Sequence, residues 1–246
     1  MKLNIVPART GALWVRLGLQ TFLRQPLAMS GLFFMYMVAV TLAEQIPVAG
    51  PFIARMLVPA ATLGMMAASA EAAKGRFPMP SVLLSAFRAG RERASAMVIL
   101  GAIFAAGSLA AWGLASLLAG ARPAAGAAGE FDPLIMLGAG LHMPLSLIFW
   151  HAPALVHWHG LAPGKSLFFS LVACLRNFPA LLVFMLTWLT LLSAIALLFI
   201  LVGVMIGGEA GAQAVVMPLM LITAAMFTTS LYFTFRDSFL ADGDPA

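Results

Sequence analysis

Histidine is the residue type with the clearest capacity for chemistry in this sequence, and all of its copies fall in one stretch. They are His142, His151, His157 and His159. An imidazole can bind a metal ion, hold a haem or transfer a proton near neutral pH. His142 and His151 are nine positions apart, or about 13 Å along a helix, which is too far for one shared metal ion. His157 and His159 flank Trp158, a pattern typical of a membrane interface.

Three interpretations of His142 and His151 are open. They can be hydrogen-bonded core residues, contacts to a substrate or a pore, or ligands of a cofactor. A haem held by two histidines needs both at one depth on two helices, and only a homodimer could supply the second ligand here. The single cysteine, Cys174, excludes a disulfide within the chain and a Cys-x-x-Cys pair, and the His-Glu-x-x-His motif is absent. We therefore expect no metal and no cofactor, with His142 and His151 as candidate cavity contacts.

Catalytic sequence patterns are also missing. The chain has no Gly-x-Ser-x-Gly elbow, no phosphate-binding glycine loop and no paired acids near a plausible reaction centre. Charged residues in the apolar segments are few, and we expect Glu44 and Arg55 to form an ion pair across a hairpin. A carboxylate at mid-membrane, which a proton-coupled transporter usually keeps, is absent too. We therefore expect that the protein is not an enzyme.

The composition predicts an integral membrane protein. Hydrophobic residues make up 62% of the chain, charged residues make up 9%, and the mean hydropathy is +1.00, whereas about 25% of the residues in a soluble domain are charged. The net charge of +5 is spread over short loops without a concentrated patch, so we expect no nucleic-acid partner. The first apolar run is longer than that of a cleaved signal peptide, which predicts an uncleaved first span.

Six apolar segments of the sequence are long enough to cross about 30 Å of hydrocarbon as helices. An amphipathic segment precedes the first, third and fifth of them, and each is expected to form a helix on the membrane surface. The predicted spans are 26–46, 52–73, 94–119, 133–158, 179–206 and 212–235. The predicted surface helices are 13–25, 81–93 and 165–178. Residues 120–132 form the longest predicted loop outside the lipid.

These segments group into three similar units, at about 11–74, 81–160 and 165–236, within a single domain of residues 1–246. Pro59, Pro144 and Pro218 each lie inside the second span of a unit, and Pro153 interrupts the fourth span again. Each unit crosses the membrane twice, so the units are related by an axis along the membrane normal. Kinks at the prolines could surround a cavity, or neighbouring helices could fill them. The expected fold is an all-α membrane protein with six transmembrane helices in three pseudo-repeated pairs.

Lysine and arginine predict the orientation of the bundle. One side holds twelve of the fourteen, so both termini and all the surface helices are expected to be cytoplasmic by the positive-inside rule. Basic side chains at that surface face an anionic leaflet and are candidate lipid contacts. They are Arg16, Arg24, Arg88, Arg91, Arg93 and Arg176.

Several short stretches give the chain a family resemblance. They are Ile5-Val6-Pro7-Ala8-Arg9-Thr10-Gly11, Phe22-Leu23-Arg24-Gln25-Pro26-Leu27-Ala28, Val58-Pro59-Ala60-Ala61-Thr62-Leu63-Gly64 and Lys74-Gly75-Arg76-Phe77-Pro78-Met79-Pro80. Together they resemble a family of uncharacterised six-span inner-membrane proteins of Gram-negative bacteria, most strongly over residues 1–95. The layout is more loosely similar to membrane domains that accompany bacterial glycerophosphodiester phosphodiesterases, but no matching catalytic domain is present. The resemblance therefore implies location and topology and transfers no activity.

Two functions follow as expectations. The first is a non-enzymatic inner-membrane protein that scaffolds or associates with other membrane components through its helix faces and basic cytoplasmic helices. The alternative is a passive transporter of small solutes, or a lipid-handling protein, that uses a cavity between the repeats. The expected partners are membrane lipids and other membrane proteins. The sequence does not fix the oligomeric state.

Overall fold

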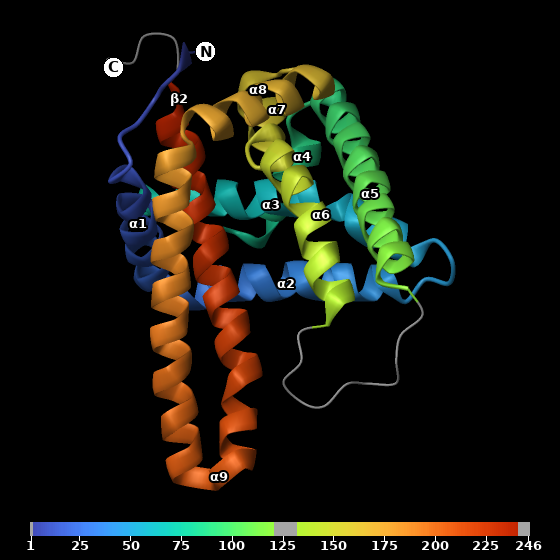
Figure 1. Cartoon of the computed structure of the whole chain (residues 1–246). Helices are drawn as coiled ribbons and strands as arrows, with labels where there is room; N and C mark the ends of the chain where they lie inside the picture. Colours follow the sequence, from blue (N-terminus) through green and yellow to red (C-terminus); the bar gives the residue numbers. More distant parts are fainter. Residues whose placement is uncertain (1, 121–131, 241–246) are drawn as a thin grey trace. The chain divides into compact units, whose positions relative to one another are not determined.

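The computed structural model describes residues 2–120 and 132–240, and this part of the chain is almost entirely helical (Figure 1). Two short strands, β1 (Lys2–Leu3) and β2 (Phe239–Leu240), pair antiparallel. The predicted all-α class is confirmed. The helices are α1 (Thr10–Arg24), α2 (Pro26–Glu44), α3 (Gly50–Ala73), the 3-10 helix η1 (Pro80–Leu84), α4 (Ser85–Arg88), α5 (Arg91–Ala119), α6 (Pro133–Phe149), α7 (Ala152–His159), α8 (Pro163–Arg176) and α9 (Phe178–Ser238).

Within the described residues, five helical segments are long and apolar enough to cross a membrane. They are α2, α3, α5, the consecutive helices α6 and α7, and α9. The first four coincide closely with predicted spans, whereas the predicted fifth and sixth spans both lie in α9, which runs for 61 residues. The loop predicted at 120–132 falls mostly outside the described residues. A multi-pass helical architecture is thus confirmed, and the division into three repeats stays a prediction.

Helix α9 is a hairpin of two helical arms. Gly207 (φ −138°, ψ 17°) and Gly208 (φ 60°, ψ −142°) interrupt the helical backbone, and glycine adopts the positive φ of Gly208 without steric cost. The arms run side by side in Figure 1 and touch near their tip, where a Cβ added to Gly203 would lie 2.7 Å from the carbonyl oxygen of Gly211. The predicted turn after residue 206 is therefore present, and each arm is long enough to cross the hydrocarbon once.

The predicted surface helix over 81–93 is wrong in its boundaries. The structure has η1 and the one-turn helix α4 there, followed by a break before α5 begins at Arg91. Gly90 has a φ of 104°, a positive value that glycine adopts easily. This conformation separates the two helices and changes the direction of the chain between them. Because of this break, Arg91 and Arg93 belong to the first turn of α5 rather than to a separate surface helix.

The predicted fourth span is divided into α6 and α7 at Trp150 and His151. Pro153 explains the division, because proline has no N–H to donate to the carbonyl of Phe149 and its ring crowds that carbonyl. Pro144, by contrast, lies inside α6. Only one of the two predicted interruptions therefore ends a helix.

The chain divides into two compact units, each made of segments that are distant in sequence. The first unit comprises Met1–Tyr36, Thr62–Ser85 and Leu175–Ala246, and the second comprises Met37–Ala61 and Ala86–Cys174. The first thus contains α1 and α9, and the second contains α5, α6 and α7.

In the first unit, α1 packs lengthwise against α9 (Figure 1). The buried face of α1 contains Trp14 and two glycines, Gly11 and Gly18, while Arg16 and Arg24 are exposed. A Cβ on Gly11 would lie 2.1 Å from the carbonyl oxygen of Ala180. The two glycines are seven positions apart and share a helix face, so α1 contacts α9 almost backbone to backbone. The amphipathic character predicted for this segment is confirmed.

A group of polar residues, which we name the terminal cluster, joins the beginning of the first unit to its end. The Nδ2 of Asn4 donates to the carbonyl of Asp237 at 2.9 Å, and the Nε1 of Trp14 donates to its carboxylate at 2.9 Å. The side chain of Asn177 accepts from the backbone N–H of Val6 at 2.9 Å and donates to the carbonyl of Asn4 at 3.0 Å and to the hydroxyl of Ser238 at 3.2 Å. These bonds and the β1–β2 pairing hold both ends of the described chain together.

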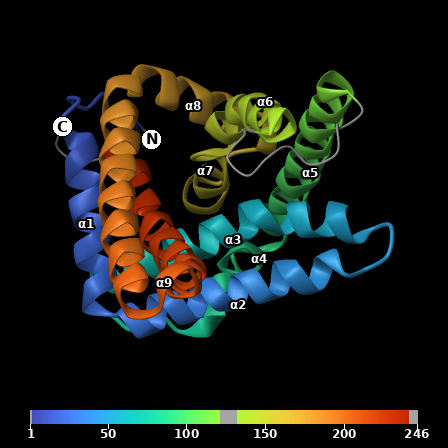
Figure 2. The same cartoon turned by 60° about the horizontal axis from the view of Figure 1, so that its bottom comes forward.

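In the second unit, α5 packs mainly against α6 and also touches α7; Figure 2 shows α5 next to α6. Gly101 brings α5 close to α3, since an added Cβ would lie 2.4 Å from the carbonyl oxygen of Met56. The ring of Phe104 on α5 meets Phe149 edge-on, with 5.1 Å between ring centroids. These contacts join the middle of α5 to α3 and α6, and the Nη1 of Arg93 joins its first turn to the carbonyl of His157 on α7 at 2.9 Å, beside the pocket described below.

Candidate functional site

His142 lies on α6 and is held in an aromatic contact. Its ring meets Phe104 of α5 edge-on at a centroid distance of 5.6 Å. Its backbone carbonyl accepts a hydrogen bond from the hydroxyl of Ser146 at 3.2 Å. Its Nδ1 is buried and has no hydrogen-bond partner among the described residues. Its surroundings are therefore those of a packed side chain with one unused polar atom.

His151 lies at the break between α6 and α7 and is only 1% exposed. Its backbone N–H donates to the hydroxyl of Ser170 on α8 at 2.9 Å, and its carbonyl accepts from the N–H of Leu155 at 3.0 Å. The Ser170 hydroxyl also lies 3.4 Å from the carbonyl of Leu147. Ser170 thus satisfies backbone groups that the helix break releases. This arrangement favours the interpretation of His151 as a core residue.

The remaining two histidines are at the C-terminal end of α7. The ring of His157 meets Trp158 edge-on at 5.5 Å, and its carbonyl accepts from the Nη1 of Arg93 at 2.9 Å. His159 is the last residue of α7 and is half-buried. Within residues 2–120 and 132–240, no three His, Cys, Asp or Glu side chains are grouped so that they could hold a metal ion.

Within the described residues, Arg55 does not form the ion pair predicted with Glu44. Its Nη1 donates instead to the carbonyl of Pro51, four residues earlier, at 2.8 Å. Glu71 pairs with Arg76, the Nη2 of Arg76 lying 2.7 Å from Oε1. This hydrogen bond to the carboxylate raises the pKa of Arg76. Both Arg76 and Glu71 belong to the first unit, where the pair closes the C-terminal end of α3.

The predicted lipid contacts are distributed over several helices. Arg16 and Arg24 are exposed on α1, Arg88 is exposed on α4, and Arg176 is exposed in the last turn of α8. Arg91 and Arg93 lie together at the beginning of α5, where Arg91 is exposed and Arg93 is half-buried. These last two line the pocket that the second unit offers as a candidate site.

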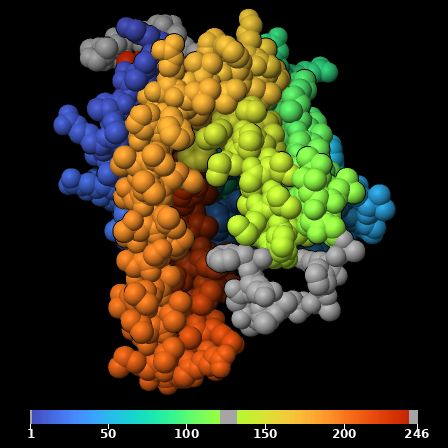
Figure 3. Space-filling view, in the orientation of Figure 1, coloured from blue at the N-terminus to red at the C-terminus, as the bar shows by residue number. Residues whose placement is uncertain are grey.

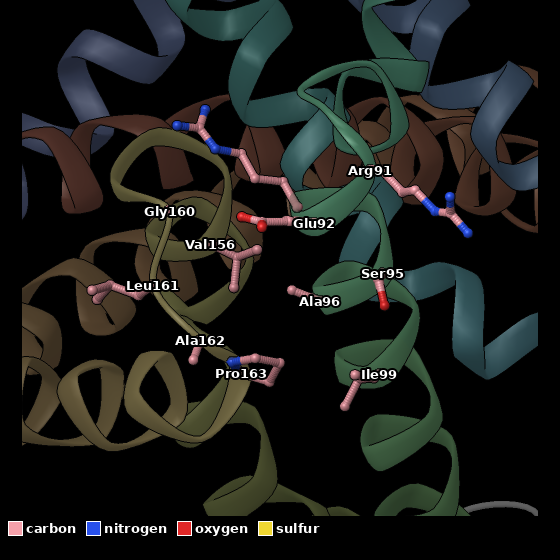
Figure 4. A pocket seen from close by; sticks show the side chains of 11 residues that line it. Arg91, Glu92, Ser95, Ala96, Ile99, Val156, Gly160, Leu161, Ala162 and Pro163 are labelled. Carbon is pink, nitrogen blue, oxygen red and sulfur yellow. The ribbon is translucent and has the colours of Figure 1, made fainter.

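This pocket lies between the first two turns of α5 and the connection from α7 to α8, and it has a volume of about 720 Å³. Figure 4 shows Glu92 pointing toward Val156 and Gly160, whereas Arg91 projects in the opposite direction. The pocket therefore has charges of both signs at its rim and apolar walls. Its lining consists of Arg91, Glu92, Arg93, Ser95, Ala96, Ile99, Val156, Gly160, Leu161, Ala162 and Pro163.

Glycine geometry shapes this pocket on both sides. Gly160 ends α7 in a left-handed conformation (φ 64°), and a Cβ there would lie 3.7 Å from both Nε and Nη2 of Arg93. Gly90 precedes α5 with a φ of 104°. The sequence pattern indicated Arg91 and Arg93 as basic residues, but it did not indicate the pocket. The available signal was a glycine on each flank, at Gly90 and Gly160.

The sequence comparisons agree with the membrane architecture. The chain is 33% identical, over 256 aligned residues, to the probable inner membrane protein BTH_II0599 of Burkholderia thailandensis, and the alignment covers 97% of this chain and 94% of that relative. The chain belongs to the BTH_II0599 family. No protein-family model and no solved structure matches it.

Membership of the BTH_II0599 family, together with the apolar helices, identifies the chain as a multi-pass inner membrane protein. The similarity extends over nearly the whole of both chains, so it includes the α9 hairpin and the pocket segments alike. The predicted family resemblance is confirmed at this level. The name of this relative gives a location and no activity.

Proposed function

We propose that this member of the BTH_II0599 family is a non-enzymatic, six-span protein that associates with lipids and other membrane proteins through uncovered helix faces. The observation that carries the proposal is the apolar surface of the α9 hairpin. Near its tip Met205 is 86% exposed, Ile206 is 83% exposed and Met217 is 72% exposed. In Figure 3, α1 covers only the upper part of the first arm. Such a surface is stable only against hydrocarbon or another apolar helix.

The six-span topology is supported by two features of the first unit. Each arm of α9 exceeds the length of about 20 residues that a crossing needs, so the hairpin supplies two spans. The pairing of Lys2 with Leu240 and of Leu3 with Phe239 places the two ends side by side. An even number of crossings is the arrangement that leaves both ends on one face, and the excess of basic residues makes that face cytoplasmic.

A cysteine-labelling experiment tests this topology. We expect a cysteine replacing Glu209, at the hairpin tip, to react in intact spheroplasts with a maleimide that does not cross membranes. A cysteine replacing Lys165, at the beginning of α8, should react only after the membrane is opened. Both residues are exposed. Labelling of both cysteines from the same side would contradict the proposed topology.

The native cysteine, Cys174, should not react in this labelling experiment. It is buried in α8, and burial raises the pKa of its thiol to about 12. The thiolate is the reactive form, so its population is very small near neutral pH and rises only as the pH approaches that value. The unmodified protein is therefore expected to stay unlabelled between pH 7 and 8 and to react after denaturation.

The association itself is tested by photo-crosslinking in living cells. A photoreactive residue at Leu197, which is 60% exposed on α9, is expected to give discrete adducts with other membrane proteins as well as lipid adducts. The same residue at Phe184, which is fully buried, is the matched control and should give neither. Lipid adducts alone at Leu197 would contradict the scaffolding part of the proposal.

The pocket at the beginning of α5 favours a second candidate function, that of a lipid-handling protein. A volume of about 720 Å³ lies within the range of about 300–1,000 Å³ that is usual for small-ligand sites. A passive solute transporter has weaker support, because the ring of His142 packs against Phe104 and His151 is only 1% exposed. Solute uptake by reconstituted vesicles that is lost on changing His142 would favour the transporter instead.

A further inference from the structure

We infer that the pocket at the beginning of α5 binds one phospholipid whose headgroup carries both a phosphate and a primary ammonium, as in phosphatidylethanolamine. This inference rests on the proposed membrane embedding of the chain and names the ligand class of the pocket. Two independent properties of the lining carry it. One is the charge at the rim, and the other is the apolar surface that continues from it.

The rim has one group suited to each end of such a headgroup. Arg93 uses only its Nη1 to reach the carbonyl of His157, so its Nε and Nη2 remain as donors to a phosphate. The carboxylate of Glu92 points toward Val156 and Gly160 (Figure 4), and Glu92 makes no ion pair with a basic side chain of the described residues. An acid beside an arginine disfavours a purely anionic ligand and favours one with a positive end.

The walls below the rim are suited to an acyl chain. Glu92, Ala96 and Ile99 are spaced by four and three positions and therefore follow one face of α5. Ile99 is 47% exposed, and Leu161 and Pro163 line the opposite side. This face of α5 is charged at the N-terminal end of the helix and apolar two turns farther along. A bilayer lipid has the same order of groups along its length, whereas a soluble phosphate ester would leave the apolar wall uncovered.

The alternative explanation of Glu92 is purely local. An acid in the first turn of a helix interacts favourably with the positive end of the helix dipole, and this stabilisation requires no ligand. The two explanations differ in their effect on lipid selectivity. Replacing Glu92 with glutamine weakens its interaction with the helix dipole whichever lipid is bound, so this effect does not distinguish among lipids. The same replacement removes a binding partner only from a lipid whose headgroup has an ammonium group.

Native mass spectrometry of the full-length protein, purified in detergent and depleted of lipid, tests the inference. The probes are phosphatidylethanolamine, phosphatidylglycerol and phosphatidylcholine with identical acyl chains. We expect the intact protein to retain phosphatidylethanolamine best. Glu92→Gln should lower that retention about tenfold and should raise the retention of phosphatidylglycerol, because the acid that disfavours an anionic headgroup is removed. Arg93→Gln should lower the retention of both.

Three controls make the result decisive. Arg88→Gln removes the same charge from α4, outside the pocket, and should change nothing. Ala162→Trp fills the pocket without changing its charge and should lower the retention of every lipid. Because it leaves Arg93 in place, it tests binding in the pocket without removing the contact between Arg93 and His157. Soluble glycerophosphoethanolamine has the headgroup without acyl chains and should compete poorly. Efficient competition by it would overturn the assignment to a lipid.

Other outcomes would also overturn the inference. One is equal retention of the three lipids by the intact protein. The other is an equal loss of lipid retention in Arg88→Gln and Arg93→Gln, which would indicate that lipid binding depends on the total positive charge rather than on the pocket. A chain that stays in the membrane at alkaline pH yet does not discriminate among the lipids contradicts only this inference. A chain that alkaline treatment extracts contradicts the proposed function as well.

Discussion

Replacing Trp14 with alanine is expected to lower the free energy of unfolding by about 3–5 kcal/mol, the usual cost of truncating a large buried aromatic side chain. Trp14 is fully buried and meets Phe184 of α9 edge-on, with 6.2 Å between ring centroids. Its Nε1 also donates to the carboxylate of Asp237 at 2.9 Å. The substitution therefore removes packing between α1 and α9 together with one bond of the terminal cluster.

A double-mutant cycle separates these two contributions. Trp14→Phe retains most of the buried area but loses the hydrogen bond to a charged acceptor, so we expect a smaller loss, of about 1–3 kcal/mol. Asp237→Ala removes the acceptor, and the double variant measures the coupling between the two side chains. Unfolding in detergent, followed by far-ultraviolet circular dichroism, provides the free energies. Additive losses in the double variant would show that the bond contributes nothing.

Replacing Gly18 with valine is expected to destabilise the same helix pair by about 3 kcal/mol, at the upper end of typical overpacking costs. A Cβ at position 18 would lie 2.4 Å from the Cβ of Ser230 on α9. The hydroxyl of Ser230 accepts a hydrogen bond from the Nε1 of Trp188, at 3.2 Å. Separating α1 from α9 therefore also disturbs a buried bond between the two arms of the hairpin.

Gly31 of α2 is the matched control for this substitution. No heavy atom lies within 4 Å of a Cβ added there. Because alanine has a higher helix propensity than glycine, Gly31→Ala should stabilise the protein slightly, by about 0.5–1 kcal/mol. The measurement is the unfolding midpoint of both variants in one detergent. An equal change in Gly18→Val and Gly31→Ala would contradict the proposed close contact between α1 and α9.

Composition and periodicity were sufficient to predict the helices but not their ends. The apolar runs that became α2, α3 and α9 follow directly from the length that a membrane crossing requires. The boundaries depended on single backbone positions. Gly90 ended α4 early, and Pro153 divided the fourth span, although Pro59, Pro144 and Pro218 each remained inside a helix. Whether a proline breaks a helix depends on its neighbours, which the local sequence does not specify.

The polar contacts were beyond sequence reasoning for a different reason. Asn177 and Asp237 lie at unremarkable positions near the ends of predicted segments, and their partners at Asn4 and Trp14 are distant in the chain. The pocket likewise combines the beginning of α5 with the connection after α7. The arginines could be predicted as basic surface residues, because charge is visible in the sequence. Their grouping with Glu92 required the three-dimensional arrangement.

The terminal cluster has a consequence for the order of events during synthesis. Asn4 and Asp237 are 233 positions apart, so the hydrogen bond between them cannot form during synthesis until Asp237 has left the ribosome. At about 5–20 residues per second, this interval is on the order of tens of seconds. During it, the exposed amides of the leading segment and the bare face of α1 are open to chaperones and proteases. The terminal cluster is thus assembled late, and a chain truncated before Asp237 leaves the side chains of Asn4 and Trp14 without this partner.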